Sequence, residues 1–417
     1  MLVPRRYFFA VIFALMAFCY QSHSQVKTMS NQDSPNIYIS CNYCSGDFLR
    51  KSLPFMNFVR DRKDADIFVQ FYDNDNGGGG VNHTIDFTGE NKFAGLNDTL
   101  HYSTNPTMTE DERRDKMLSY LKMGLLRYIL RTPLVEKAEV TYNFKSDSNE
   151  TKQDDWDSWV FQIGAQAYFS GQSSYSDINA WGNISASRTT EGMRTGFDIS
   201  NSFNQDVFYI DTSKIVSISK SLSVGANNVF SIDDHWSAGI WAYYSKSSYS
   251  NLDLNISCQP GIEYNIFPYS DYTRRQLRIN YKIGPSYKKY IDTTIYDKIK
   301  ETLIGQSLTA SFEYILPWGS FSCSVSGDSY LHDLSKNQFS VNAYNSVKIF
   351  KGLSMNFSIS YSSIHNQLNL PKAGATRDEV LLRRKQLETQ YNFWGSFGIS
   401  YTFGSIYDNV VNPRFGG

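Results

Sequence analysis

Two cysteines near the amino terminus are the first residues whose types and spacing could do chemistry. Cys41-Asn-Tyr-Cys44 has the spacing of a redox-active pair and lies between a predicted strand and a predicted helix. The segments that follow do not predict a thioredoxin-like sheet, and a zinc site would need a second ligand pair, which is missing from the sequence pattern. A disulfide between Cys41 and Cys44, or two unpaired thiols, fits better than redox catalysis or zinc.

Two histidines lie near groups that hydrolases use. His235 follows Asp233 and Asp234, a carboxylate–histidine cluster, but Asp-Asp is also ordinary turn chemistry. His332 has serines nearby, and a Ser–His nucleophile would need an orienting amide at a spacing that the sequence does not single out. We therefore predict no catalytic residue, no metal and no cofactor.

Six charged residues form the third set, because each occupies a polar position in a segment where apolar and polar residues alternate. Successive side chains of a strand point to opposite faces, so these six share the polar face. Charges there must pair or contact water. Two interpretations stay open: a structural network that fills an interior, or the selective lining of a narrow channel. The six residues are Asp198, Asp253, Glu263, Arg278, Lys282 and Glu313.

The segments that carry these charges predict an antiparallel transmembrane β-barrel. Apolar residues alternate with Ser, Asn, Gln, Gly and Thr, as expected when one face contacts lipid and the other is polar. We count about twelve strands, with about ten or fourteen as alternatives. The first strand shows the pattern in Phe161, Ile163, Ala165, Ala167 and Phe169. The strands begin near residues 156, 175, 194, 213, 236, 252, 273, 302, 319, 338, 352 and 385.

The last of these segments resembles the terminal signal by which the outer-membrane insertion machinery recognises its clients. Phe397, Ile399, Tyr401 and Phe403 alternate with small polar residues. The signal usually ends the chain, whereas here a tail, residues 405–417, follows. The expected partners are therefore outer-membrane lipid and, during biogenesis, the insertion machinery.

The amino-terminal residues predict export. Arg5 and Arg6 precede an apolar run at residues 7–18, and Ser22 and Ser24 suit cleavage before Gln25, so residues 1–24 are a predicted signal peptide. No later segment is apolar over the roughly 18 residues that a membrane helix needs. The net charge of −1 gives no electrostatic case for binding nucleic acid.

Residues 25–144 have the pattern of a separate small α/β domain. Strands are predicted at 36–40, 65–72, 83–87 and 99–103, with one helix over 47–59 and another after Thr109. This order, with Ala65-Asp-Ile-Phe-Val69 entering a glycine-rich hairpin, resembles the amino-terminal domain of TolB. The resemblance implies a periplasmic interaction module. Its docking surfaces would be the charged runs at 60–64 and 110–115, unless these are simply solvated loops and helix ends.

The remaining boundaries follow from the composition. Residues 145–155 are a predicted linker, 156–404 the barrel and 405–417 the tail. An even strand number puts both ends of the barrel on the periplasmic side, beside the N-terminal domain. The short connections at 190–192, 232–235, 268–272, 317–319 and 351–352 would then be periplasmic. The longest connection, 365–384, would be external, with a predicted helix beginning in it at 375–387.

Three longer motifs resemble a family of uncharacterised outer-membrane barrel proteins from Bacteroidetes. The resemblance spans the mature chain and implies an outer-membrane barrel with a periplasmic domain, but no activity. The motifs are Glu263-Tyr-Asn-Ile-Phe-Pro-Tyr-Ser with Tyr272-Thr-Arg-Arg-Gln276, Asp378-Glu-Val-Leu-Leu-Arg-Arg-Lys-Gln386, and the stretch from Tyr401 to Phe415.

The sequence as a whole predicts an α+β protein, in which a small periplasmic α/β domain precedes an antiparallel transmembrane β-barrel of about twelve strands. The favoured function is non-enzymatic: the N-terminal domain docks an unknown periplasmic protein, in envelope organisation or assembly. A narrow solute channel of the outer membrane is the first alternative. An outer-membrane hydrolase is the second, and it rests on fold analogy alone.

Overall fold

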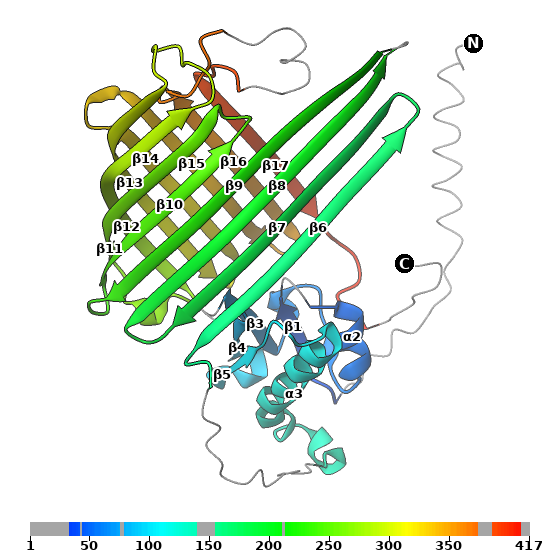
Figure 1. The fold of residues 1–417 in the computed structure, drawn as a ribbon. Helices are drawn as coiled ribbons and strands as arrows, with labels where there is room; N and C mark the ends of the chain where they lie inside the picture. Colours follow the sequence, from blue (N-terminus) through cyan, green and yellow to red (C-terminus); the bar gives the residue numbers. More distant parts are fainter. Residues whose placement is uncertain are drawn as a thin grey trace.

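The computed structural model describes residues 33–41, 44–75, 79–139, 155–210, 213–373 and 386–409. The predicted signal peptide, most of the predicted linker, most of the predicted helix at 375–387 and residues 410–417 of the tail lie outside these ranges. The described chain forms a small α/β domain and a long antiparallel sheet (Figure 1).

Twelve strands make up the long sheet, and each pairs with the strands that precede and follow it in the sequence. The predicted strand number and the antiparallel arrangement are thereby confirmed. The strands are β6 (Trp159–Gln172), β7 (Tyr175–Thr189), β8 (Met193–Ile210), β9 (Ser213–Ser231), β10 (Trp236–Ser247), β11 (Leu252–Asn265), β12 (Arg275–Tyr290), β13 (Lys300–Leu316), β14 (Gly319–Tyr330), β15 (Asp333–Phe350), β16 (Leu353–Ile364) and β17 (Tyr391–Tyr401).

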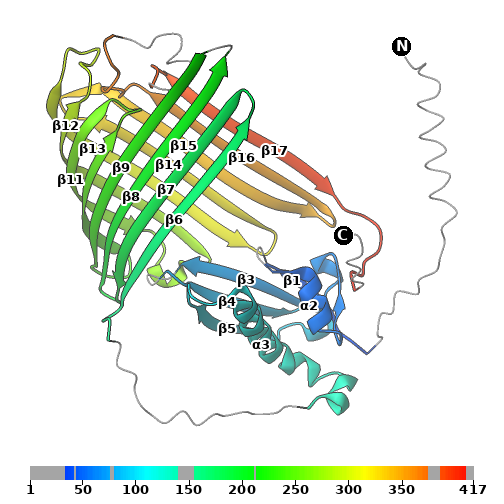
Figure 2. The same ribbon diagram turned by 45° about the vertical axis from the view of Figure 1, so that its right-hand side comes forward.

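The alternation of side chains gives this sheet two chemically different faces. The sheet is strongly curved, so that one face is concave (Figures 1 and 2). Large apolar side chains lie exposed on the convex face, for example Ile256 at 49%, Leu308 at 51% and Ile399 at 62%. Polar positions of neighbouring strands, among them Gln259 and Lys282, line a concave cavity of about 370 Å³.

The two terminal strands of the sheet are not paired with each other in the described residues. β6 pairs with β7, and β17 pairs with β16. Every residue of β17 is exposed, as expected for a strand with one unpaired edge. The sheet is therefore curved but has two edges.

The connections at one end of the sheet are short turns, and the longer connections at the other end pack on one another. Asn251 Nδ2 donates to the carbonyl oxygens of Asp292 and Asn369, each at 2.9 Å. Leu368 and Leu370, from the longest connection, are each only 5% exposed. That end therefore carries ordered loops, whereas the turn end faces the N-terminal domain (Figure 2).

The N-terminal domain is a five-stranded sheet with helices on one face. The strand order is β2-β1-β3-β4-β5, with β1 parallel to β2 and β3 and the other pairs antiparallel. The elements are β1 (Asn36–Ser40), α2 (Gly46–Ser52), β2 (Asn57–Phe58), β3 (Ile67–Asp75), β4 (Val81–Gly89), β5 (Asn97–Thr104) and α3 (Glu110–Ile129), with short 3-10 turns η1 (Arg62–Asp64), η2 (Asn91–Phe93) and η3 (Pro133–Lys137).

The predicted helix over 47–59 is wrong in its second half. Helix α2 ends at Ser52, and Asn57 and Phe58 form the edge strand β2 instead. The reason is Pro54, because a residue that precedes proline is disfavoured in the helical region. Leu53 accordingly adopts φ −125° and ψ 56°, which ends the helix.

Helix α3 covers one face of the small sheet, as its apolar spacing predicts. Thr109 caps it, with the Thr109 hydroxyl accepting from the Glu112 amide and Glu112 reaching back to the Thr109 amide. The core beneath it includes Leu121, Leu125 and Phe87, all nearly unexposed. The opposite face of the sheet turns toward the long sheet (Figures 1 and 2).

Helices that could span a lipid bilayer do not occur among the described residues.

Candidate functional site

The concave face of the long sheet carries five of the six charged residues that the sequence singled out. Glu263 pairs in register with Ser237 and Asn280, and Glu313 with Gln276 and Ser322, all of them polar. Arg278, Lys282 and Asp198 likewise pair with small or polar residues. Asp198 pairs with Ser185 and Gly225, Arg278 with Asn265 and Ser311, and Lys282 with Gly261 and Ser307.

Glu263 is the centre of a hydrogen-bond network near the turn end of this face. Tyr269 Oη donates to Glu263 Oε1 at 3.0 Å, and Ser237 Oγ donates to Tyr269 Oη at 2.9 Å. Asn280 Nδ2 reaches the other carboxylate oxygen at 3.4 Å. Tyr269 comes from the 3-10 turn η4 (Tyr269–Asp271) between β11 and β12, and burial raises the pKa of its phenol.

Two cations flank this network. Lys282 Nζ lies 3.8 Å from the ring centre of Trp241, a distance at which a cation and an aromatic face attract each other. Arg278 Nε is buried and has no hydrogen-bond partner among the described residues. The concave face near Glu263 therefore holds one anchored carboxylate and two cations that have donors left for water or a solute.

Asp253 lies apart from the others, at the outer end of β11 beside a register shift. Lys246 Nζ and Lys289 Nζ contact its two carboxylate oxygens at 3.0 and 2.7 Å. All three side chains are substantially exposed, so this cluster is a rim ion network. The sequence placed Asp253 with the other lumen-lining candidates, but it could not show the two lysines that contact it.

Tyr269 and Trp241 are the residues that the sequence analysis missed. Trp241 has the same strand parity as the polar positions of β10, which is the signal that could have identified it. Tyr269 lies in a connection, where strand parity says nothing. The turn folds back so that Tyr269 contacts Glu263, and only the three-dimensional structure shows this contact.

A second candidate site is the junction between the N-terminal domain and the turn end of the sheet. Three cations of the sheet contact acceptors of the domain: Arg274 Nη2 donates to Asp86, Lys351 to Asp64 at 2.8 Å, and Lys348 to Tyr38. The Arg274 guanidinium also lies over the ring of Tyr72 at 5.7 Å. The junction is electrostatically complementary, with positive turns against acidic and aromatic side chains.

The predicted docking surface at residues 60–64 lies inside this junction. Besides the Asp64 contact, Asp61 Oδ2 accepts from the Gly352 amide at 3.1 Å. The run therefore binds this chain's own sheet in the structure. The second predicted surface, 110–115, is the first turn of α3, where Asp111 pairs with Arg114 at 2.9 Å and Glu112 completes the cap.

The cysteines and histidines have structural surroundings. Cys41 and Cys44 form a disulfide beside the junction, and Cys258 and Cys323 are free thiols in strands β11 and β14. Asp233 accepts from the His235 and Trp236 amides at 2.7 and 2.8 Å, and these bonds lower the pKa of its carboxyl.

The Asp233 bonds are turn chemistry, as the sequence suggested. His332 lies beside the ring of Tyr330, with ring centres 5.9 Å apart. Nowhere in the described part of the chain do three His, Cys, Asp or Glu side chains gather as metal ligands would.

The four residues of the predicted insertion signal form one exposed row. Phe397, Ile399, Tyr401 and Phe403 are between 57% and 79% exposed, and the rings of Tyr401 and Phe403 stack at 5.6 Å. An exposed apolar row on the last strand suits contact with lipid.

Comparison with known proteins gives only distant likenesses. No family model and no curated protein matches the chain. A NanC porin structure has a TM-score of 0.29 with 11% identity, covering 58% of this chain and 99% of its own. A KdgM porin has 0.26 with 13%, covering 59% and 100%. The translocator domain of the autotransporter NalP from Neisseria meningitidis has 0.24 with 9%, covering 59% and 86%. At such scores the function has to be argued from the residues themselves.

Proposed function

We propose that this chain is an outer-membrane β-barrel protein whose concave face lines a narrow channel for small polar solutes. The N-terminal domain lies on the periplasmic side, across the turn end. Outer-membrane lipid and, during biogenesis, the insertion machinery are its partners in this proposal. The resemblances to the Bacteroidetes family and to the amino-terminal domain of TolB agree with this placement.

The observation that supports the proposal best is the contrast between the two faces of the sheet. One face exposes aliphatic and aromatic side chains along eleven of the twelve strands, which water disfavours and lipid accepts. The other face carries Glu263, Arg278, Lys282 and Glu313, which need water or a polar partner. In a soluble protein the apolar face would have to be covered by other elements. If the concave side were a packed apolar core, the charged side chains there would be excluded from it.

Closure of the sheet belongs to the same proposal. In lipid, the unpaired N–H and C=O groups of a strand edge have no water to bind, so an open edge is strongly disfavoured. β6 and β17 run antiparallel because the strand number is even. Pairing of these two edges in the membrane would therefore satisfy both with ordinary antiparallel hydrogen bonds.

The channel is favoured over docking of another protein for a specific reason. The acidic residues Asp61 and Asp64, which belong to one of the two predicted docking surfaces, contact Gly352 and Lys351 of the same chain. On the concave face, by contrast, Glu263, Arg278 and Lys282 pair in register with small or polar residues. Charges in such surroundings need water or a polar solute beside them.

Single-channel recording of the full mature chain in planar bilayers tests the proposal. Steady openings are expected, and Glu263→Gln should shift ion preference toward anions whereas Arg278→Gln shifts it toward cations. Asp111→Asn, on the far side of the N-terminal domain, is the matched control and should leave selectivity unchanged. A silent protein, or two variants that both keep the original selectivity, would reject the channel.

A further inference from the structure

The residues that follow β17 cross to the N-terminal domain and pair with its edge strand. We call this segment, residues 405–409, the strap. Tyr407 forms an antiparallel bridge with Val59, directly after β2. The Arg60 amide donates to Ile406 O at 3.0 Å, and the Asp408 amide donates to Phe58 O at 2.9 Å. The strap therefore extends the edge of the small sheet by one antiparallel β-bridge.

The hydrogen bonds of this edge alternate as a strand requires. The amides of Asn57 and Val59 donate to Pro35 O and Ile37 O, on the β1 side, each at 3.0 Å. The intervening amides point the other way: Phe58 N donates to Asn409 Oδ1 at 2.6 Å, and Arg60 N binds the strap as described above. Without the strap, these outward amides and the Phe58 carbonyl would form an open sheet edge.

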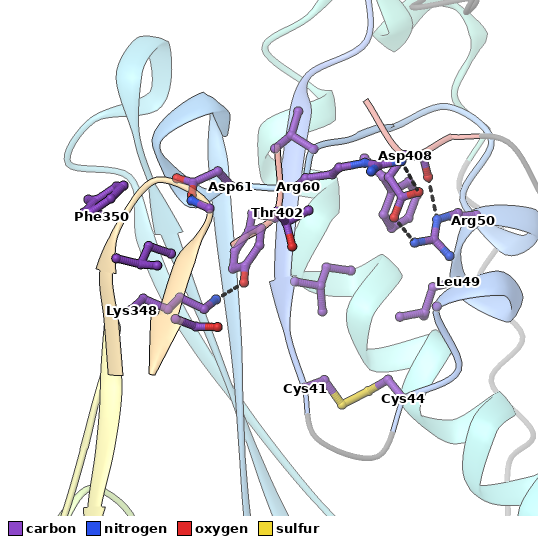
Figure 3. A pocket seen from close by; sticks show the side chains of 18 residues that line it. Cys41, Cys44, Leu49, Arg50, Arg60, Asp61, Lys348, Phe350, Thr402 and Asp408 are labelled. Carbon is purple, nitrogen blue, oxygen red and sulfur yellow. Dashed lines mark hydrogen bonds and ion pairs between the residues drawn. A yellow bond between two sulfur atoms is a disulfide. The ribbon is translucent and has the colours of Figure 1, made fainter. Parts of the chain in front are cut away.

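One acidic side chain fixes the strap in register. Asp408 Oδ2 accepts from Arg50 Nη2, Arg50 Nε donates to the Asp408 carbonyl, and Arg60 Nη2 lies 3.6 Å from Asp408 Oδ1 (Figure 3). Asp47 holds the Arg50 guanidinium in place at 3.0 Å. The Arg50 side chain is only 19% exposed, so its charge gains more from a partner than a surface arginine would.

We propose that the edge of β2, together with Arg50 and Arg60, is a strand-acceptor site that recognises an extended segment carrying an acidic residue. Its occupant is the chain's own strap, which fixes the N-terminal domain across the turn end of the sheet. Such strand addition draws affinity from main-chain bonds and specificity from one or two side chains. The strap does not depend on whether the concave face conducts ions.

Chain continuity argues for the chain's own segment as the occupant. Thr402 N still donates to Gly352 O at 2.8 Å, so β17 is held against the β15–β16 turn up to that point. Gly404 then adopts φ +122°, a conformation that residues with a side chain rarely adopt, and the chain turns toward the domain. So short a connection keeps the effective concentration of the strap at its site high.

Disulfide crosslinking in the full mature chain tests the strap. Val59 and Tyr407 are a non-hydrogen-bonded antiparallel pair, whose Cα atoms lie about 4.5 Å apart, within disulfide reach. Val59→Cys with Tyr407→Cys, in a background where Cys258 and Cys323 are alanine, should crosslink within one chain under mild oxidation. Val59→Cys with Ser405→Cys is out of register and should crosslink far more slowly.

The anchor is tested in the same background. Asp408→Asn should slow crosslinking about tenfold, as expected for the loss of charge-assisted bonds. Asp408→Glu should restore part of the rate, and Asp111→Asn on α3 should have no effect. Heat-modifiable gel migration shows that each variant has a folded sheet.

Three outcomes would overturn the strap. Crosslinks between two chains would mean that copies exchange the segment, and an absent crosslink in a folded protein would mean that it does not seat. An Asp408→Asn variant that crosslinks at the original rate would remove the acidic anchor. A silent channel with an intact crosslink would reject the proposed function and leave the strap standing.

Discussion

Reversing the charge of Arg274 should loosen the N-terminal domain from the sheet without unfolding either part. In the structure Arg274 donates to Asp86, whose side chain is 12% exposed, and Asp86 also accepts from Thr99 Oγ1 at 2.7 Å. In Arg274→Glu a carboxylate replaces the guanidinium, so an attraction becomes a repulsion across the junction.

The magnitude follows from the exposure of the pair. Two unit charges about 4 Å apart interact by about 4 kcal/mol at an effective dielectric of about 20. The Arg274 side chain is 56% exposed, so water screens much of this, and about 1 kcal/mol is a realistic loss of attraction. Adding about 1 kcal/mol of new repulsion gives a total of about 2 kcal/mol, or about thirtyfold in the docking equilibrium.

Amide hydrogen exchange of the junction measures this change. The Gly352 amide donates to Asp61 Oδ2 at 3.1 Å, a bond that exists only while the domain is docked. Exchange at Gly352 should therefore be about thirtyfold faster in Arg274→Glu, since protection reports the opening free energy. Asp86→Arg in the same chain should restore most of the protection.

The control for this experiment is Arg113→Glu, which changes the same charge on the exposed surface of α3. It should leave exchange at Gly352 unchanged. Equal protection in the wild-type protein and Arg274→Glu, or failure of the charge-swapped pair to recover, would refute the electrostatic account of the junction.

Two further predictions concern the N-terminal domain alone. Gly124→Ala should destabilise the domain by about 1 kcal/mol in denaturant titrations, because the new Cβ would lie 2.1 Å from the buried Phe87 ring. This loss is expected although alanine favours helices over glycine. Ser119→Ala, on the exposed face of α3, is the control and should not destabilise the domain. Burial raises the pKa of Tyr72 and Tyr128 to about 12 from 10.0, so these phenols ionise more readily in the unfolded chain. Domain stability, followed by circular dichroism, should hold up to about pH 10 and fall between pH 10 and 12; a flat profile there would contradict it.

The strands of the long sheet could be predicted from the sequence because each repeats a local rule. Alternation with a period of two specifies both the strand and its apolar side, and the predicted starts at 175, 213, 236, 252 and 319 coincide with the observed ones. The β15 start was placed at 338, although the strand begins at Asp333, since Asp333, Ser335 and Asn337 are polar at the positions that Phe339 and Val341 continue as apolar ones.

Long-range contacts could not be predicted in this way. The strap joins residues more than three hundred positions apart, as in the Arg50–Asp408 pair, and nothing local in Tyr407-Asp408-Asn409 indicates a strand partner. The helix at 47–59 failed for a different reason, because apolar spacing was given more weight than Pro54. The charged run at 60–64 was predicted as a docking surface for another protein or as a solvated loop, and its contacts with the chain's own β15–β16 turn are defined only by the fold.

The contacts of the N-terminal domain have a consequence for assembly. They come from Arg274 after β11, from the β15–β16 turn and from the strap after β17, positions that lie together only when the strands between them are paired. While the sheet is half formed, any one of these contacts would close a long loop of unpaired chain. The entropic cost of closing that loop is about as large as the free energy that one partly exposed ion pair contributes. The domain is made first, but it can seat firmly only when the last strand is in place. Docking of the N-terminal domain is therefore a consequence of completing the sheet. The strap couples the two, because it follows the last strand, β17, directly.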